Sequence, residues 1–326
     1  MQSAVFCRIP CLLGGEGIFL LGLSTHFLSA LTAAHDAAAT QHHPASTLYV
    51  IATPIGNLAD ISLRALHVLS VCDTLACEDT RHSQTLLRSY GIERNSSHWL
   101  AVHQHNETQA AQEVIQRLQA GQRVAYVSDA GTPAVSDPGA RLVWQVQAAG
   151  FRVMPLPGAS SVTALLSACG SFTAEASGFV FVGFLPSKAA ERERAVQLLT
   201  SEGRAQVLLE APHRIEALAT ALAALGDRMV TVGRELTKQF EEIATLPANA
   251  LSDWISSNPQ RTRGEFALVV HSQTVISDPI EVHDKMLRLL MQEVPLKTAV
   301  RLTADLTGES RNLLYDRALA LKDTDT

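Results

Sequence analysis

Three short segments of the chain carry the residue types best suited to hold a small polar ligand. Residues 53–57, 128–133 and 157–161 each follow an apolar run, and each combines Gly with Pro, Ser or Thr. Glycine allows a ligand to approach the backbone closely, and successive backbone N–H groups in such turns bind polar groups. Any one of these segments could be only a tight turn between a strand and a helix. Three of them at successive strand ends favour a single binding crevice.

Charged side chains that could act on a substrate gather in three other segments, residues 78–81, 210–214 and 234–238. Carboxylates and histidines can remove a proton, and Lys or Arg can stabilise an oxyanion that forms during a reaction. Each segment also has a simpler interpretation. The second could be an ion-paired helix start, and the first and third could each hold an ion pair between residues three apart. The sequence therefore indicates no unique catalytic base.

Several common site types are not expected. No segment has the Gly-x-Gly-x-x-Gly pattern of dinucleotide sites or the Gly-x-x-x-x-Gly-Lys-Ser/Thr pattern of phosphate loops. The formal charge of −6 argues against a protein that coats nucleic acid non-specifically, so any such contact must be local. The five cysteines and twelve histidines, including His103 and His105, lack the spacing of metal ligands. We therefore predict no metal site.

The elements that must position these residues alternate between strands and helices. Short apolar runs alternate with amphipathic stretches near residue 61 and over 108–120, which indicates an α/β fold. The sequence pattern changes after Ser171, where a second group of apolar runs begins. The predicted strands are residues 48–52, 72–77, 124–127 and 152–156 in the first group, and 179–182, 206–209, 229–232 and 265–270 in the second.

The chain is long enough for about two domains with sizeable cores. An apolar run over residues 18–31 weakly resembles a secretory signal, but Glu16 and several glycines argue against one, and we expect a poorly ordered extension there. Residues 297–321 could form a helix-turn-helix-like hairpin, whose few extra basic residues suit either solvated faces or RNA docking. The predicted parts are a disordered N-terminal extension (1–46), two α/β domains (47–170 and 171–275) and a helical C-terminal segment (276–326).

Taken in order, these motifs resemble the tetrapyrrole methylase superfamily, in its ribosomal RNA small subunit methyltransferase I branch. The resemblance runs from Thr47 to Lys322. Two small departures are Ala159, where Pro often stands, and Ala211, where Ser is usual. The matching segments are residues 49–58 with 64–66, 78–81, 105–107, 127–133, 136–139, 157–161, 183–186, 210–215, 233–238, 240–242 and 264–266.

The resemblance implies a class III S-adenosyl-L-methionine methyltransferase with a two-domain α/β fold and a small helical C-terminal segment. It implies that the enzyme methylates the ribose 2′-hydroxyl of a cytidine in the decoding region of 16S rRNA, within the 30S subunit, as a cytoplasmic homodimer without membrane association. The implied cofactor-binding residues are Pro54, Gly56, Ser128, Asp129, Gly131, Thr132, Ala159, Ser160, Ser161 and Leu209. The candidate catalytic residues are Glu78, Arg81, His213, Arg214 and Lys238.

Two alternatives stay open at this point. A methyltransferase of the same fold could methylate carbon atoms of a precorrin-type tetrapyrrole, which also requires S-adenosylmethionine. A non-enzymatic ribosome assembly factor could use the glycine loops as structure only and the C-terminal helices for docking. The charged residues 78–81 and 212–214, together with the C-terminal segment, favour RNA as the substrate.

Overall fold

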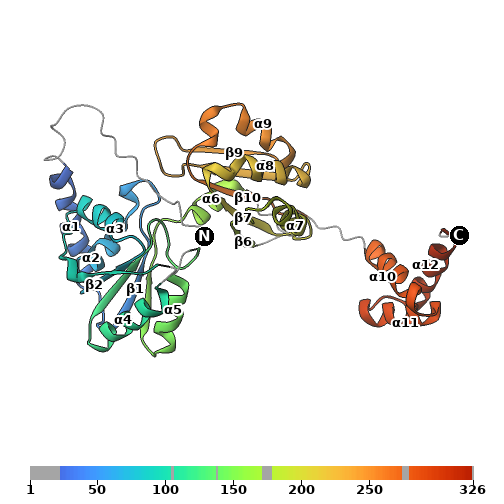
Figure 1. Ribbon diagram of the computed structural model, residues 1–326, viewed down its shortest axis with the longest axis horizontal. Helices are drawn as coiled ribbons and strands as arrows, with labels where there is room; N and C mark the ends of the chain where they lie inside the picture. The colour runs from blue at the N-terminus through green and yellow to red at the C-terminus, as the bar shows by residue number, and fades with distance from the viewer. Residues whose placement is uncertain (1–22, 104–105, 137–138, 171–177, 274–278, 325–326) are drawn as a thin grey trace. The chain divides into compact units, whose positions relative to one another are not determined.

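The computed structural model describes residues 23–103, 106–136, 139–170, 178–273 and 279–324 (Figure 1). The chain forms two compact units, residues 1–273 and 274–326. The first unit contains two five-stranded sheets, and the described part of the second is helical. Among the described residues, no helix has the length and apolar character needed to span a membrane.

The first sheet is entirely parallel and has the order β3-β2-β4-β1-β5. Its alternate side chains face opposite sides, since Tyr49 and Ile51 enter one core cluster while Leu48 and Val50 enter another. Burial on both faces explains why the three central strands, β1, β2 and β4, are nearly continuous apolar runs. The strands are β1 (Thr47–Ile51), β2 (Thr74–Cys77), β3 (Trp99–Ala101), β4 (Arg123–Val127) and β5 (Arg152–Leu156).

Helices cover both faces of this sheet, as Figure 1 shows. α2 (Leu63–Val71) and α3 (Thr80–Ser89) supply buried residues to one core cluster, while α4 (Glu107–Gln119) and α5 (Gly139–Ala148) supply the other. The side chain of Ser62 caps α2 by accepting the N–H of Ala65, a common helix start. Because all five strands are parallel, their carboxyl ends, and the loops that follow, lie at one edge of the sheet.

The N-terminal region departs from the expected disorder. Residues Leu23–Ala38 form a helix, α1, which packs against α2. Ala34 and Ala38 are fully or almost fully buried, and Ala34 belongs to the same core cluster as Tyr49. The prediction of a poorly ordered extension is therefore wrong from residue 23 onward, because small side chains let this helix approach α2. Residues 1–22 lie outside the described residues.

The second sheet has the order β6-β7-β10-β8-β9, with only β6 and β7 parallel. The helices α7, α8 and α9 contribute to a core cluster on one face, and α6 packs on the other. The two sheets fall on either side of residue 170, and the division of the first unit there stays a prediction. The elements are α6 (Ser161–Cys169), β6 (Phe179–Gly183), α7 (Ala189–Thr200), β7 (Ala205–Glu210), α8 (Ile215–Leu222), β8 (Met229–Arg234), β9 (Glu242–Pro247), α9 (Leu251–Ser256) and β10 (Phe266–Val270).

The second unit consists of α10 (Pro279–Glu293), α11 (Leu296–Thr307) and α12 (Arg311–Thr324). Gly308 ends α11 in a left-handed conformation, so the chain turns and α12 begins three residues later. This confirms the helical hairpin predicted over residues 297–321. The unit has a core of its own, made by Leu287, Val300, Ala304, Leu314, Ala318 and Leu321.

Short 3-10 turns in the first unit are Leu58–Asp60, Ser96–His98, Pro212–Arg214, Ala223–Leu225, Ala248–Ala250 and Pro259–Thr262.

Candidate active site

The loops after β1 and β4 are joined by backbone hydrogen bonds. The N–H of Thr53 donates to the carbonyl of Gly131 over 2.9 Å, and the N–H of Gly131 donates back to the carbonyl of Thr53 over 3.0 Å. The Thr53 hydroxyl also donates to the carbonyl of Ser128 over 3.4 Å. Ser128 itself is 4% exposed. Two of the three predicted loops therefore lie side by side.

The loop after β5 completes the group. The Thr132 hydroxyl donates to the carbonyl of Ala159 over 3.0 Å. Gly131 has a φ of +80°, and a Cβ added there would lie 3.2 Å from Ile55 Cγ2 and 3.7 Å from the Ala159 carbonyl oxygen. A Cβ on Gly158 would lie 2.9 Å from the Cβ of Ala52. The three loops thus meet as predicted, and glycine is needed at the points of closest approach.

The loop after β2 joins the same edge. The N–H of Asp79 donates to Asp129 Oδ1 over 3.3 Å. Asp79 is the N-cap of α3, because its carboxylate accepts the N–H of Arg81 over 2.8 Å. Glu78 is half-buried beside it, while the side chain of Arg81 is exposed. Among the predicted catalytic residues, Glu78 is therefore the one that directly follows a strand of the first sheet.

An apolar cluster connects these loops to the second sheet. It contains Ile55 with the partly buried Ala130 and Ala159 from the loops, and it contains Leu209 of β7 and Leu236 after β8. Leu209 is 6% exposed. The structure thus brings Leu209 into the same cluster as the three loops, and its contact with the cofactor stays a prediction. Ser160 begins α6 as its N-cap residue, although its side chain makes no capping hydrogen bond.

Lys238 brings a loop of the second sheet to Gly56. A Cβ on Gly56 would overlap Lys238 Cγ and would lie 3.1 Å from Thr237 Oγ1. That threonine hydroxyl is buried and has no hydrogen-bond partner among the described residues. Gly56 therefore permits the close approach of the two loops. It also leaves an unpaired polar atom next to the predicted cofactor loops.

The Lys238 ammonium is held by two carboxylates. Nζ donates to Glu235 Oε1 over 2.8 Å and to Glu265 Oε2 over 3.1 Å, and the N–H of Glu265 donates to the same Glu235 oxygen. Burial acts to lower the pKa of Lys238, but the hydrogen bonds and charges of both carboxylates outweigh it and raise the pKa above its usual value. Lys238 is therefore a cation at neutral pH and is not suited to remove a proton. The predicted ion pair with Glu235 exists, in a loop and not on a helix.

A second buried charge stands at the end of β7. The Glu210 side chain is 1% exposed, and Arg214 Nε lies 3.0 Å from its Oε1, although the N–H is not aligned for a hydrogen bond. Burial raises the pKa of Glu210, against the lowering effects of the Ala211 N–H and of Arg214. Arg214 also donates to the carbonyl of Leu185. Arg214 thus fits the simpler interpretation of an ion-paired helix start, while His213 beside it is exposed.

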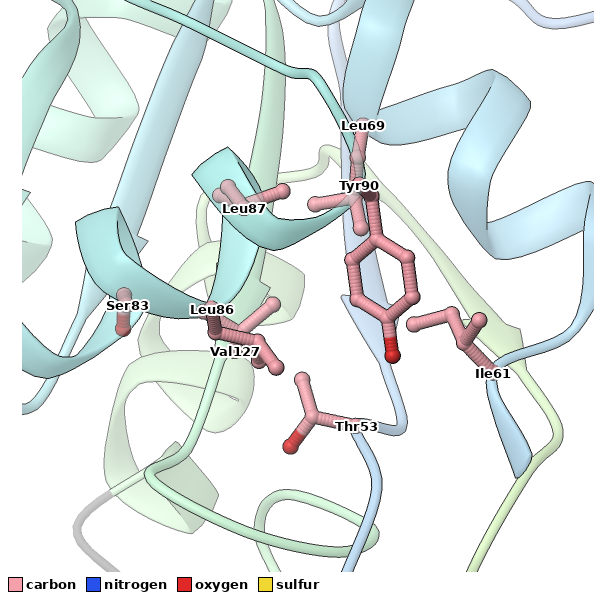
Figure 2. A pocket seen from close by; sticks show the side chains of 8 residues that line it. All are labelled: Thr53, Ile61, Leu69, Ser83, Leu86, Leu87, Tyr90 and Val127. Carbon is pink, nitrogen blue, oxygen red and sulfur yellow. The ribbon is translucent and has the colours of Figure 1, made fainter. Parts of the chain in front are cut away.

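A small cavity lies under the first sheet's loops but does not suit the cofactor. Figure 2 shows the Tyr90 ring and the Thr53 hydroxyl among the side chains that line it. Its volume is about 10 Å³, which is room for about one water molecule. Its lining residues are Thr53, Ile61, Leu69, Ser83, Leu86, Leu87, Tyr90 and Val127, and none of the predicted cofactor-binding residues is among them.

The structure brings polar groups and glycines of several loops together at one edge of the first sheet. The loop glycines, the polar side chains of Ser128 and Asp129, and the unpaired hydroxyl of Thr237 gather around the carboxyl ends of β1, β4 and β5. Sequence reasoning missed Thr237 and the role of Glu265. Among the described residues, no group of three or more His, Cys, Asp or Glu side chains could hold a metal ion. His105 and residues 137–138, which belong to matching motifs, lie outside the described residues.

Comparisons with known proteins agree with this arrangement. The family model described as "Tetrapyrrole (Corrin/Porphyrin) Methylases" matches residues 47–252, and the model of the "RsmI C-terminal HTH domain" matches residues 277–322. Solved structures with the same fold include a cobalt precorrin-4 methyltransferase (TM-score 0.50, 18% identity, 69% of this chain and 94% of that one). A diphthine synthase is also similar (TM-score 0.53, 16% identity, 70% and 90%).

Curated relatives are much more similar in sequence. A protein of Pseudomonas aeruginosa named "Ribosomal RNA small subunit methyltransferase I" is 45% identical over 280 residues, which are 84% of this chain and 97% of the relative. The protein of the same name from Escherichia coli O157:H7 is 41% identical over 83% of this chain and 94% of its own length. The chain therefore belongs to the tetrapyrrole methylase family and, within it, to the ribosomal RNA small subunit methyltransferase I group.

Proposed function

We propose that this protein is an S-adenosyl-L-methionine-dependent methyltransferase that methylates the 2′-hydroxyl of a cytidine ribose in the decoding region of 16S rRNA. The observation that supports the proposal most strongly is the meeting of the β1, β4 and β5 loops, in a chain that is 45% identical to a protein named as an rRNA small subunit methyltransferase. The substrate class comes from the names of the relatives. The ribose position comes from the resemblance noted in the sequence.

The cofactor is assigned to the loop cluster. S-adenosylmethionine, when bound, supplies an electrophilic methyl group on a sulfonium. Ser128, Asp129, Gly131 and Thr132 would hold it together with Ala159, and the remaining contacts are assigned to Pro54, Gly56, Ser160, Ser161 and Leu209. Backbone groups and small side chains suit this ligand because they leave room for the adenosine and offer donors to its carboxylate.

The charged residues at the second sheet orient the substrate and stabilise negative charge. A ribose hydroxyl has a high pKa, so a cation near the oxygen favours loss of its proton as the new bond forms. Arg214 and Arg81 are proposed as such cations, while His213 and Glu78 are proposed as groups that accept the proton. Lys238 is a positioning residue, because its ammonium already binds Glu235 and Glu265 while its stem packs on Gly56.

The partners follow from the same proposal. The substrate is the 30S subunit or its 16S rRNA, and the protein acts in the cytoplasm as a homodimer. The helical unit α10–α12 is assigned to docking on the RNA, since it matches the model of a helix-turn-helix domain. Helix-turn-helix units place one helix against nucleic acid.

The experiment that tests this function measures methyl transfer directly. Purified protein is incubated with labelled S-adenosylmethionine and 30S subunits from cells that lack the protein. We expect label in 16S rRNA, and mass mapping of the product should find one 2′-O-methylcytidine in the decoding region. A methyl group on a base, or at another ribose, contradicts the proposed position.

The same assay separates the two alternatives. A precorrin-type tetrapyrrole is offered in a parallel reaction, because a cobalt precorrin-4 methyltransferase has the same fold. Label in the tetrapyrrole and none in RNA identifies a tetrapyrrole C-methyltransferase. Calorimetry at micromolar protein that finds 30S binding but no S-adenosylmethionine binding identifies an assembly factor.

A further inference from the structure

Phe240 is a large aromatic side chain that is 69% exposed. It lies in the loop between β8 and β9, two residues after Lys238. The stem of Lys238 packs on Gly56, so this loop reaches the loops assigned to the cofactor. An exposed phenyl ring adds nothing to the core. Its place beside the proposed active site suggests that it contacts a substrate.

The loop that carries Phe240 is held firmly from several sides. Arg234 donates from Nη2 to the carbonyl of Phe240 over 3.2 Å, and the N–H of Thr237 donates to Glu241 Oε2 over 2.6 Å. Glu235 and Thr237 have φ values of 51° and 67°, in the left-handed region that non-glycine residues rarely occupy. Such backbone conformations persist only where the surroundings enforce them, and they cluster at functional sites. The backbone that carries Phe240 is therefore held in place.

The same arginine brings a second exposed side chain to this place. Arg234 Nη1 donates to the carbonyl of Arg263 over 3.3 Å, so one guanidinium binds the backbones of both Phe240 and Arg263. The Arg263 side chain is exposed, and within the described parts of the chain it forms no ion pair. Its neighbour Arg261 differs, since it pairs with Glu242 and lies over Trp254. An open aromatic face and an unengaged cation thus stand on adjacent backbone segments.

Nearby carboxylates do not oppose an anionic ligand strongly. Glu242 is bound by Arg234 and Arg261, and Glu241 accepts the N–H of Thr237. An unpaired base can stack on an aromatic ring, while a guanidinium binds the phosphate beside it. This combination is how single-stranded nucleic acid is commonly held. A second copy of this chain suits this surface less well, because an interface between copies is expected to be apolar and to bury no unpaired cation.

We propose that Phe240 and Arg263 form a nucleotide subsite for the substrate RNA, in which the phenyl ring stacks on an unpaired base and the guanidinium binds an adjacent phosphate. The inference rests on the proposed RNA methylation. It adds the residues that hold the strand next to the reacting ribose.

The test compares variants of Phe240 in the full-length protein, with 30S subunits and labelled S-adenosylmethionine. Phe240→Ala should raise KM for 30S subunits roughly tenfold, since base stacking on an aromatic ring contributes about this much to binding. Phe240→Leu should lose nearly as much, because it keeps the apolar area without the ring face, and Phe240→Tyr should restore binding. Affinity for S-adenosylmethionine should not change. Trp144→Ala, at an aromatic side chain that is 67% exposed on α5, serves as the matched control and should bind 30S subunits normally.

Arg263→Gln gives an independent readout. It should weaken 30S binding and reduce the salt dependence of that binding by about one phosphate contact. If Phe240→Leu binds RNA like the wild type, or if Phe240→Ala loses an oligomer in sedimentation equilibrium, the surface serves protein contact and the subsite is wrong. A wild-type protein that methylates RNA while Phe240→Ala is unaffected overturns the subsite alone. A wild type without RNA activity overturns the proposed function as well.

Discussion

At the scale of single residues, the two buried carboxylate–cation groups behave differently. Lys238 is shared by two carboxylates at the loop edge, and their charges raise its pKa. Glu210 is enclosed more completely, and burial raises its pKa although Arg214 lies beside it. Burial therefore makes ionisation of Glu210 less favourable in the folded protein than in the unfolded chain. The retention of Glu210 next to Arg214 and His213 is consistent with a functional demand and not with a gain in stability.

This difference predicts a pH dependence of stability. The unfolded chain releases the Glu210 proton near pH 4.5, and the folded chain releases it at a higher pH. Above pH 4.5 the folded state thus binds more protons than the unfolded state, so the stability due to this group falls as pH rises through the raised pKa. The wild type should lose stability relative to Glu210→Gln between pH 4.5 and neutrality in urea unfolding. Arg214→Gln should steepen the loss, because it removes a charge that lowers the Glu210 pKa, and a flat difference contradicts the assignment.

The residues of the site could be predicted from the sequence only where local pattern sufficed. The loop glycines could be predicted, since Gly, Pro and Ser that follow an apolar run are typical of a turn after a strand. The partnership of Lys238 with Glu265 is different, because the two residues are 27 positions apart. They meet only because β8 pairs with β10 in a register that places Arg234 opposite Phe266. Spacing along the chain contains no information on that register.

At the scale of elements, the buried strands were the most predictable part of the fold. All eight predicted apolar runs begin or end within a residue of a strand boundary, and 152–156 coincides with β5. β3 and β9 were missed, and both lie at the edge of their sheets. β3 has only three residues, and in β9 exposed and half-buried side chains alternate without a continuous apolar run. α1 was missed because an Ala-rich helix packed through Ala34 gives a weak amphipathic signal. All three missed elements have little buried apolar surface of their own.

The close approach of neighbouring loops to Gly131 predicts that adding one methyl group there weakens S-adenosylmethionine binding, whereas the same change at an open glycine does not. Gly131 and Gly150 have φ values of +80° and +82°, so Ala at either position should cost about 1–2 kcal/mol of stability. Only at Gly131 does the new Cβ meet neighbours, namely Ile55 and the Ala159 carbonyl. Gly131→Ala should therefore also weaken S-adenosylmethionine binding, by roughly tenfold or more if the displaced loops hold the cofactor. Gly150→Ala is the matched control, and isothermal titration of both variants makes the comparison.

Wild-type affinity for S-adenosylmethionine in both glycine variants would contradict the assignment of the cofactor to the β1–β4–β5 loops. A loss in both would indicate that the backbone strain, and not the local contact, disturbs binding. The comparison is informative because the two positions share a conformation and differ in what surrounds them.

At the scale of the whole molecule, the chain combines a large α/β unit with a small helical one. The first unit contains four core clusters over its two sheets, and the second relies on a single small cluster around Leu314. A three-helix unit of this size is expected to have a small free energy of unfolding. The family model for the methylases ends at residue 252, and a separate model begins at residue 277. Both observations indicate that the two units can be perturbed separately.

Leu314→Ala should unfold the second unit and leave the first intact. Leu314 is fully buried, and truncation of such a side chain costs about 2–5 kcal/mol, as much as a small helical unit can supply. Leu306→Ala, at a side chain that is 71% exposed on α11, is the control and should change little. We expect limited proteolysis to cleave Leu314→Ala after residue 273 while S-adenosylmethionine affinity stays normal. Methylation of 30S subunits should fall, because RNA docking is assigned to α10–α12; an unchanged rate would remove that assignment and leave substrate recognition to the first unit.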